Sequence, residues 1–261
     1  MTLSLALCFD APMQSWGTRS AHIKRDTARE PTKSGVVGLL ASALGVSRDD
    51  DEKVAALAEL KLGVRVDREG LVEVDYQTAQ NVPNTAGGGH RTVVSHRYYL
   101  SDALFLVVLG ASTLRQEALL RRVEIALRVP EWPLYFGRKA FVPARPLLRD
   151  ASSDALSGWG LSDRPVCEVL HAHPWLETGP SREAVARRFR GSREPIPPPP
   201  LRAVQDCATT DQRAEIRPDH PLSFRRGNRR FASRSFKTID IEFTEELLMA
   251  GGARVPEQID C

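Results

Sequence analysis

The stretch "PTKSGVVGLLASALGVSRDD" at residues 31–50 predicts the first helix of the fold. Its valines, leucines and alanines recur at the spacing of one helix face, Thr32 or Ser34 can cap the start, and Gly45 can end the helix. The apolar run "LSLALCF" at residues 3–9 precedes it and predicts a buried strand. The chain therefore begins with a strand that is followed by a helix.

The next segments continue this alternation. Ser47 and Asp50 resemble a capping box that opens a second, short helix. Residues 61–69 and 71–77 then alternate between apolar and polar side chains. This pattern predicts the two strands of a hairpin, with the turn near Gly70.

Residues 78–98 break the regularity, because they contain a proline and three consecutive glycines. They predict a long excursion between strands. An apolar strand resumes at 98–110, and a capping box at Thr113 opens an amphipathic helix that ends near Arg128. The order strand, helix, strand, strand, strand, helix predicts an α+β protein with a ferredoxin-like or RRM-like core and a long insertion.

The second half of the chain predicts a β-rich C-terminal region at residues 151–261, after a first domain at 1–150. Residues 165–177 predict a strand, and residues 229–243 predict a basic turn that runs into a strand. The Pro/Arg-rich segment at about 178–202 ends in four prolines and cannot continue a sheet. It is predicted to be an exposed insertion that is partly helical.

Charge and cysteine content limit the classes of function. The formal net charge is only +3, although eight basic residues stand against two acidic ones between Arg213 and Lys237. This cluster is a weak indication of a polyanionic partner. No apolar run approaches the roughly 20 residues that cross a bilayer, so we expect a cytoplasmic protein that binds no membrane. The four cysteines are far apart and have no zinc spacing, which predicts free thiols, no metal and no cofactor.

The helix start "PTKSG" is a candidate phosphate site. Unpaired backbone N–H groups and the positive end of the helix dipole favour an anion there. A nucleotide-binding P-loop is not indicated, because threonine replaces the glycine expected before the lysine. The alternative is an ordinary capped helix with a solvated lysine. The candidate residues are Thr32, Lys33, Ser34 and Gly35.

Two stretches, "YFGRKAF" at 135–141 and "RRFASRSF" at 229–236, place aromatic rings beside cations. This combination suits base stacking together with phosphate pairing. The alternatives are a β-turn with one buried aromatic for the first stretch and a solvated basic edge strand for the second. The candidate RNA contacts are Tyr135, Gly137, Arg138, Lys139, Arg230, Phe231 and Arg234.

Catalytic patterns are scarce. His171 and His173 lie two residues apart, but no cysteine or carboxylate partner accompanies them, so no metal site is predicted. A metal-independent ribonuclease would need a general base, a general acid and a cation near one phosphate. The residues that could supply these groups are His90, His96, Tyr98 and Lys33. Their spacing does not indicate that they converge.

Four stretches, taken in this order, resemble one family. They are residues 11–17, 31–50, 135–147 and 221–236. Together they are similar to the CasD-type RAMP subunits of the type I-E CRISPR Cascade surveillance complex. The resemblance covers the chain from residue 3 to about 150, which would be the RAMP domain, and resumes from about 220 to 245. The segment at 178–212 departs from the family's pattern.

The resemblance implies a non-catalytic subunit for antiviral defence. Such a subunit binds the 5′ handle of the CRISPR RNA (crRNA) and caps one end of the complex. Its partners would be the crRNA, the CasC backbone subunit, the CasA large subunit and, through the complex, target DNA. In the related type I-C branch a homologue cuts RNA with Tyr, His and Lys. The alternative is therefore a metal-independent endoribonuclease that processes CRISPR repeat RNA.

The resemblance also implies RNA contacts in the first loop and in a thumb that closes over the RNA. Met13 and Trp16 would stack on splayed bases, Gln14 would read a base edge, and Gly17 would let the backbone pass close to the RNA. The alternative is that Trp16 fills the space beneath its own loop. The thumb would match residues 78–98 by position. Its candidate contacts are His96, Arg97 and Tyr98.

Overall fold

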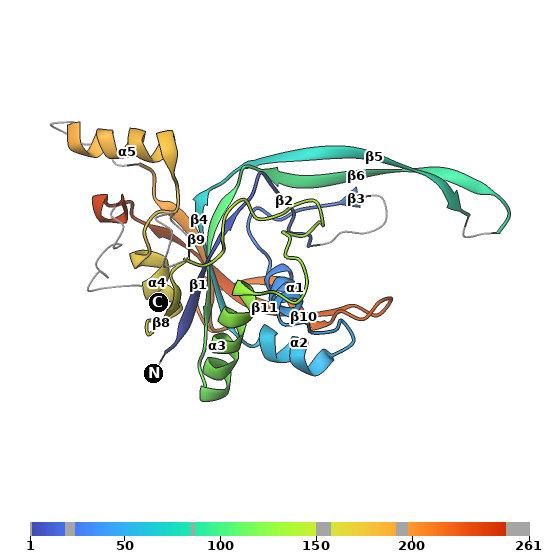
Figure 1. Ribbon diagram of the computed structural model, residues 1–261, viewed down its shortest axis with the longest axis horizontal. Coiled ribbons are helices and arrows are strands. Elements are labelled where there is room, and N and C mark those ends of the chain that lie inside the picture. Colours follow the sequence, from blue (N-terminus) through green and yellow to red (C-terminus); the bar gives the residue numbers. More distant parts are fainter. Residues whose placement is uncertain (1, 19–23, 85–86, 150–157, 192–197, 249–261) are drawn as a thin grey trace.

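A seven-stranded sheet crosses the centre of the molecule (Figure 1). The computed structural model describes residues 2–18, 24–84, 87–149, 158–191 and 198–248. In sheet order, the strands are β10 (Glu215–Ser223), β11 (Arg230–Ile241), β9 (Leu201–Asp206), β4 (Lys61–Arg68), β7 (Leu104–Gly110), β1 (Ser4–Asp10) and β8 (Gly160–Ser162). Each strand is antiparallel to its neighbours.

Four of these strands form the predicted ferredoxin-like core. Helix α1 (Lys33–Ala43) and the short helix α2 (Asp51–Ala58) lie between β1 and β4 in the chain, and helix α3 (Leu114–Arg128) lies between β7 and β8. The order β4-β7-β1-β8 in space, with helices after the first and third strands of the chain, is that of the ferredoxin-like motif. The α+β fold class is therefore confirmed.

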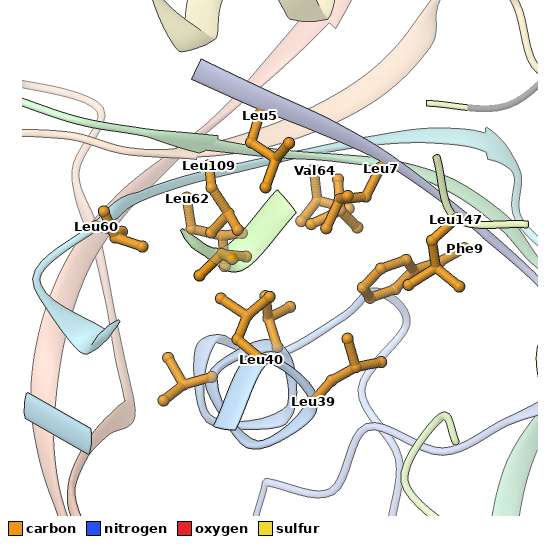
Figure 2. Close-up of a cluster of buried hydrophobic side chains, with 14 of the residues drawn as sticks. Leu5, Leu7, Phe9, Leu39, Leu40, Leu60, Leu62, Val64, Leu109 and Leu147 are labelled. Atoms are coloured by element: carbon orange, nitrogen blue, oxygen red, sulfur yellow. The ribbon is translucent and has the colours of Figure 1, made fainter. Parts of the chain in front are cut away.

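The core lies between this sheet and its helices. Successive side chains of a strand point to opposite faces, so Leu5, Leu7 and Phe9 of β1 share one face. All three are fully buried and pack with Leu40 of α1 in one cluster (Figure 2). Cys8 points the other way, into a second apolar cluster on the opposite face of the sheet. The central strands are therefore covered on both faces, which explains their near-continuous apolar sequence.

The C-terminal strands β9, β11 and β10 extend the same sheet beyond β4. Gly63 of β4 pairs with Gln205 of β9, so the β-rich C-terminal region joins the core edge to edge. The division into two domains at residue 150 stays a prediction. Helix α5 (Gly179–Gly191) lies in the segment that was predicted to be partly helical, and a 3-10 helix, η1 (Glu245–Leu248), follows β11.

Residues predicted to form a strand at 165–177 instead begin with helix α4 (Val166–Ala172), so that prediction was wrong. A short apolar run does not distinguish a buried strand from a buried helix. The deciding interaction is remote in sequence, because Arg65 of β4 donates to the carbonyls of Leu170 and His173 at 2.7 and 2.8 Å. A buried guanidinium thus satisfies carbonyls at the end of α4, where the helix dipole favours a cation.

A long two-stranded arm leaves the sheet (Figure 1). It consists of β5 (Leu71–Pro83) and β6 (His90–Ser101), which pair along their length. Two short strands, β2 (Met13–Gln14) and β3 (Lys24–Arg25), pair with the other edge of β6. The arm is regular for most of its length, so the insertion begins before the predicted residue 78.

The predicted hairpin between residues 61–69 and 71–77 does not form. β4 pairs with β7 and β9, whereas β5 pairs with β6. Both sides of the arm bend at one level, where Gly70 and Asp102 have φ angles of +68° and +57°. A Cβ at Gly70 would lie 2.6 Å from the Ser101 carbonyl oxygen, so only glycine fits this bend. Gly70 therefore marks a change of sheet and not a hairpin turn.

Arg68 stabilises the bend through hydrogen bonds to Asp102. Its guanidinium donates to the Asp102 backbone carbonyl at 2.6 Å and to the Asp102 carboxylate at 2.9 Å. It also donates to both carboxylate oxygens of Glu177, at 2.8 and 2.9 Å. One side chain therefore ties the root of the arm to the segment that follows α4.

The cysteine prediction was correct in part. Cys8 and Cys207 are free thiols, but Cys167 is disulfide-bonded, so the prediction of free thiols was wrong for Cys167. Burial raises the pKa of the Cys8 thiol to about 12. Within the part of the chain that the structure describes, no helix is long and apolar enough to span a membrane.

Candidate nucleic-acid interface

The most basic part of the arm is its base, where two separate segments meet β6. Lys24 and Arg25 of β3 pair with His96 and Arg97 of β6. On the loop at residues 135–141, Arg138 donates to the backbone carbonyl of Tyr98 at 2.6 Å. We call the surface made by β3, this loop and residues 95–99 of β6 the arm base.

The alternation of β6 divides the arm base into two faces. Arg97 lies on one face, where its Nε donates to Ser95 Oγ at 3.2 Å and where Arg25 and Arg138 also lie. We call this the basic face. The three candidate residues of the thumb thus do not share a surface, because His96 and Tyr98 point the other way.

The opposite face carries rings, and we call it the aromatic face. Tyr76 of β5 pairs with His96 across the arm, and their ring centroids are 5.4 Å apart in an edge arrangement. The Lys24 ammonium lies 5.7 Å from the centroid of the Tyr98 ring. Tyr76 is 63% exposed, so this face offers rings to a ligand.

The cations of the basic face are close enough to perturb one another. The pKa of Arg138 is lowered, chiefly because its guanidinium is partly buried and next because Arg97 repels its charge. Arg25 lowers the pKa further, while Asp75 opposes the shift. Such repulsion between fixed guanidinium groups is relieved when a polyanion lies between them.

The loop at residues 135–141 is held against the first loop of the chain. The Ser15 N–H donates to the Phe136 carbonyl at 3.0 Å. Gly137 has a φ of +88°, and a Cβ there would lie 1.9 Å from the Ser15 carbonyl oxygen. Phe136 is fully buried against Phe9, with ring centroids 4.7 Å apart. Glycine and the buried ring together aim Arg138 at the arm, while the neighbouring Lys139 is exposed and Tyr135 is half-buried.

Trp16 and Gln14 are buried within the protein, which contradicts the prediction that their side chains face RNA. Trp16 is 1% exposed, and its ring lies 5.7 Å from those of both Phe9 and Phe136. Gln14 is fully buried: its amide donates to the Ala103 carbonyl at 2.8 Å, and its oxygen accepts from the indole Nε1 at 3.2 Å. The indole fills the space beneath its own loop, which is the alternative considered in the sequence analysis.

Part of this pocket for the indole comes from residues distant in sequence. Phe9 ends the apolar run just before the loop, but Phe136 comes from the loop of the arm base and could not be linked to Trp16 from residues 10–17. A Cβ at Gly35 would lie 2.7 Å from the indole, so this glycine makes room for the ring of Trp16. Met13 is 37% exposed and Gly17 is exposed, and their contact with RNA stays a prediction.

The start of α1 is not a phosphate site, because the protein's own carboxylates occupy it. The Lys33 N–H donates to the Asp219 carboxylate at 2.9 Å, and the Lys33 ammonium pairs with Asp206 at 2.7 Å. Thr32 caps the helix by accepting from the Gly35 N–H at 3.3 Å. Ser34 lies beside this cap, with its Oγ 3.4 Å from Thr32 Oγ. Lys33 therefore holds the start of α1 to the C-terminal strands, while Thr32 and Ser34 belong to the helix cap.

Arg234 belongs to the same ionic cluster and was also wrongly predicted to contact RNA. It is 9% exposed and pairs with Asp219 at 2.7 Å and with Asp206. Arg230 and Phe231 are exposed at the far end of the β10–β11 hairpin, and Arg230 lies 3.6 Å from Asp51 of α2. The structure thus separates the "RRFASRSF" stretch from the arm base, and RNA binding by Arg230 and Phe231 stays a prediction.

Sequence reasoning missed Lys24 and Arg25 of the arm base and Tyr76 of β5, whose ring adjoins His96 on the aromatic face. The adjacent pair of cations at residues 24 and 25 was the only local signal. Nothing in the sequence linked it to Arg97, since the parallel pairing of β3 with β6 joins residues 72 positions apart, from 25 to 97.

Catalytic and metal chemistry receive limited support. Among the described residues, no group of three potential metal ligands is assembled. His173 is fully buried, with its ring centroid 4.5 Å from that of Trp159. His90 and His96 lie six residues apart on one strand, which separates them by about 20 Å. Lys33 is buried with Asp206, so the four residues considered for a ribonuclease do not converge.

Comparisons with known proteins agree with this fold. The sequence profile of the family described as CRISPR-associated protein (Cas_Cas5) matches residues 4–237. A curated relative, the CRISPR system Cascade subunit CasD of Escherichia coli strain K12, is 34% identical over 154 residues, which cover 55% of this chain and 68% of that protein.

Two solved structures are similar over nearly the whole chain. A chain from a CRISPR RNA-guided surveillance complex has a TM-score of 0.69 and 31% identity over 92% of this chain and 90% of that one. A Cas protein crystal structure has a TM-score of 0.64 and 34% identity over 93% and 96%. Because the family match runs from β1 through the ferredoxin-like core and into β11, the chain belongs to the CRISPR-associated Cas5 protein family.

Proposed function

We propose that this protein is a non-catalytic subunit of a type I-E CRISPR Cascade complex and binds the 5′ handle of the crRNA at the arm base. The observation that carries the proposal is the basic face. Arg25, Arg97 and Arg138 come from three segments and lie close enough to lower the pKa of Arg138. Phosphates bound between them would gain charge-assisted hydrogen bonds and relieve this repulsion.

The aromatic face supports single-stranded RNA as the ligand. Unpaired bases stack on tyrosine and histidine rings, whereas a duplex hides its bases. Tyr76, His96 and Tyr98 would take bases, while the basic face holds the backbone. The residues that stay candidate contacts beside them are Met13, Gly17, Tyr135, Gly137 and Lys139.

The proposed place of the subunit follows from the family. The protein would cap one end of the Cascade backbone in antiviral defence, with the CasC backbone subunit and the CasA large subunit as its protein partners. It would meet target DNA only as part of the complex, in the cytoplasm. The E. coli relative is named as a Cascade subunit, and one similar structure is a surveillance complex guided by CRISPR RNA, which supports this assignment.

Neutralising the basic face should weaken RNA binding. We expect Arg97→Gln/Arg138→Gln to lower the slope of log affinity against log salt by about 1.4, since each lost phosphate contact on a single strand removes about 0.7. At about 0.15 M salt this corresponds to about 10-fold weaker binding. Fluorescence anisotropy of labelled repeat RNA from the neighbouring CRISPR array, over a salt series, measures both quantities.

The matched control is Arg121→Gln/Arg188→Gln, which removes the same charge from exposed positions on α3 and α5. Its salt slope should equal that of the wild type. If the arm-base variant behaves like this control, the basic face does not hold RNA and the proposal fails.

A second candidate function is cleavage of repeat RNA without a metal. It is favoured by the aromatic face, which brings the Lys24 ammonium, the His96 imidazole and the phenols of Tyr76 and Tyr98 onto one surface. These groups are a cation, a general base and general acids of the type such a reaction needs. Lys24 would supply the cation for which the sequence analysis considered Lys33.

Repeat RNA incubated with the full chain in EDTA decides between the two functions. We expect the RNA to remain intact, because the proposed role needs binding alone. A specific product that disappears in both His96→Ala and Lys24→Ala would show that the aromatic face is catalytic. Gln212→Ala, at an exposed position in the loop between β9 and β10, is the control.

A further inference from the structure

A second cationic surface lies on the turn between β10 and β11. We call residues 225–230, "RRGNRR", the arginine tip. Four of its six residues are arginines and none is acidic. Figure 1 shows the β10–β11 hairpin running past α2, with the arm on the other side of α1. The tip and the arm base are therefore different surfaces.

The turn is fixed by its own backbone. The Asn228 N–H donates to the Arg225 carbonyl at 3.1 Å, and Gly227 has a φ of +77°. A left-handed third residue with this hydrogen bond describes a type II turn, in which glycine is favoured at that position. Arg226 therefore occupies one corner of a rigid turn, and Arg229 follows it directly.

Two of the four arginines hold the turn to the protein. Arg225 and Arg230 lie 3.3 and 3.6 Å from the same carboxylate, Asp51 at the start of α2. Arg225 also donates to the Asp49 carbonyl at 3.1 Å. At the base of the turn, the rings of Phe224 and Phe231 pack at 6.4 Å.

The other two arginines have no such role. Arg226 and Arg229 are exposed, and within the described residues neither has a hydrogen bond or an ion pair. The paired arginines thus fix the position of the turn and leave two guanidinium groups facing solvent. Such an arrangement reduces the entropy that these groups lose when they bind a ligand.

We propose that the arginine tip binds the phosphate backbone of double-stranded DNA. Guanidinium groups pair bidentately with phosphate oxygens, and a duplex is the nucleic acid with the higher density of phosphates. Beside the tip lies one partly exposed ring, that of Phe231, which packs on Phe224, so the tip does not offer the several rings on which successive bases of a single strand stack. The arm base has those rings. We therefore expect the arm base to bind a single strand and the arginine tip to bind a duplex.

This inference goes beyond the proposed function and does not depend on it. The two cations are not used by the fold or by the arm base. Contacts to phosphates carry no sequence information, so the binding is expected to be independent of DNA sequence. A tip of this kind would position a duplex beside the subunit and leave sequence recognition to other groups.

The test compares duplex and single-strand binding in one variant of the full chain. We expect Arg226→Gln/Arg229→Gln to lower the salt slope for a DNA duplex of about 20 base pairs by about 1.8, because each lost contact on a duplex removes about 0.9. At about 0.15 M salt the duplex should bind about 30-fold more weakly. Binding of single-stranded repeat RNA should not change.

Two further variants control the charge and the geometry. Arg121→Gln/Arg188→Gln removes the same charge elsewhere and should keep the wild-type slope. Arg226→Lys/Arg229→Lys keeps the charge and should keep the slope while losing the bidentate pairing. Melting temperatures of all three should match that of the wild type, since neither tip arginine has a partner in the fold.

Two results would overturn the inference. In the first, Arg226→Gln/Arg229→Gln binds the duplex as tightly as the control Arg121→Gln/Arg188→Gln does. In the second, the glutamine variant loses the same factor in affinity for RNA and for the duplex, which would make the tip part of the single-strand site. If the wild type binds duplex through the tip but does not bind repeat RNA, the function proposed for the arm base fails and the tip assignment stands.

Discussion

Trp16→Ala is expected to lower the free energy of unfolding by about 3–5 kcal/mol, the usual cost of truncating a buried aromatic residue. The indole is 1% exposed, stacks on Phe9 and is enclosed by Phe136. Its Nε1 also donates to Gln14, which would lose a buried partner. Urea denaturation followed by circular dichroism measures the loss. The RNA affinity of the fraction that remains folded should not change.

Trp132→Ala is the matched control, because the Trp132 indole is 44% exposed. Its cost should be about 1 kcal/mol or less, as for most surface substitutions. The opposite pattern for Trp16→Ala, with stability kept and RNA affinity lost, would return the indole to the RNA-binding surface and contradict the packing described here.

Arg65→Met is expected to cost about 3–5 kcal/mol, the penalty for removing one partner of a buried ion pair. Arg65 is fully buried in β4, and its guanidinium meets both oxygens of Asp67 at 2.7 and 3.0 Å. It also donates to the carbonyls of Leu170, His173 and Pro174. Methionine leaves the carboxylate without its cation and removes this donor from all three carbonyls, so α4 should loosen first. Hydrogen exchange in residues 166–172 measures this loosening.

A double variant separates the effect of the unpaired Asp67 carboxylate from the effect of losing the N–H donors of Arg65. Arg65→Met/Asp67→Asn removes the unpaired carboxylate but not the unsatisfied carbonyls, and it should recover part of the stability. If Arg65→Met unfolds at the same urea concentration as the wild type, the guanidinium does not support α4. The helix would then depend on its apolar contacts alone.

Local pattern predicted the elements of the core well. The periodicities of residues 3–9, 31–45 and 113–128 led to β1, α1 and α3, because each element buries one regular face. The ferredoxin-like class also followed from the order of these elements, although the predicted pairing of residues 61–69 with 71–77 was wrong. The segment 165–177 was predicted wrongly because α4 depends on Arg65, about a hundred residues earlier in the chain.

The candidate site was less predictable for the same physical reason. Lys33 and Arg234 carry charges that suit RNA, but Asp206 and Asp219 neutralise them, and these partners lie in a different part of the chain from Lys33. A sequence shows where a cation is and not whether a carboxylate reaches it. Arg138 lies beside Arg97 and Arg25, and its predicted contact with RNA stays a prediction.

The order of strands in the sheet has a consequence for biosynthesis. β4 is complete once residue 68 leaves the ribosome. Its second edge pairs with β9, so Gly63 cannot form its pair until Gln205 has been synthesised. During the synthesis of about 140 residues, from the end of β4 to the end of β9, this edge of β4 has no partner strand. Contacts of such long sequence separation also slow folding. The charged Lys61, Arg65 and Asp67 on this strand would make premature pairing between nascent chains costly until the C-terminal strands arrive.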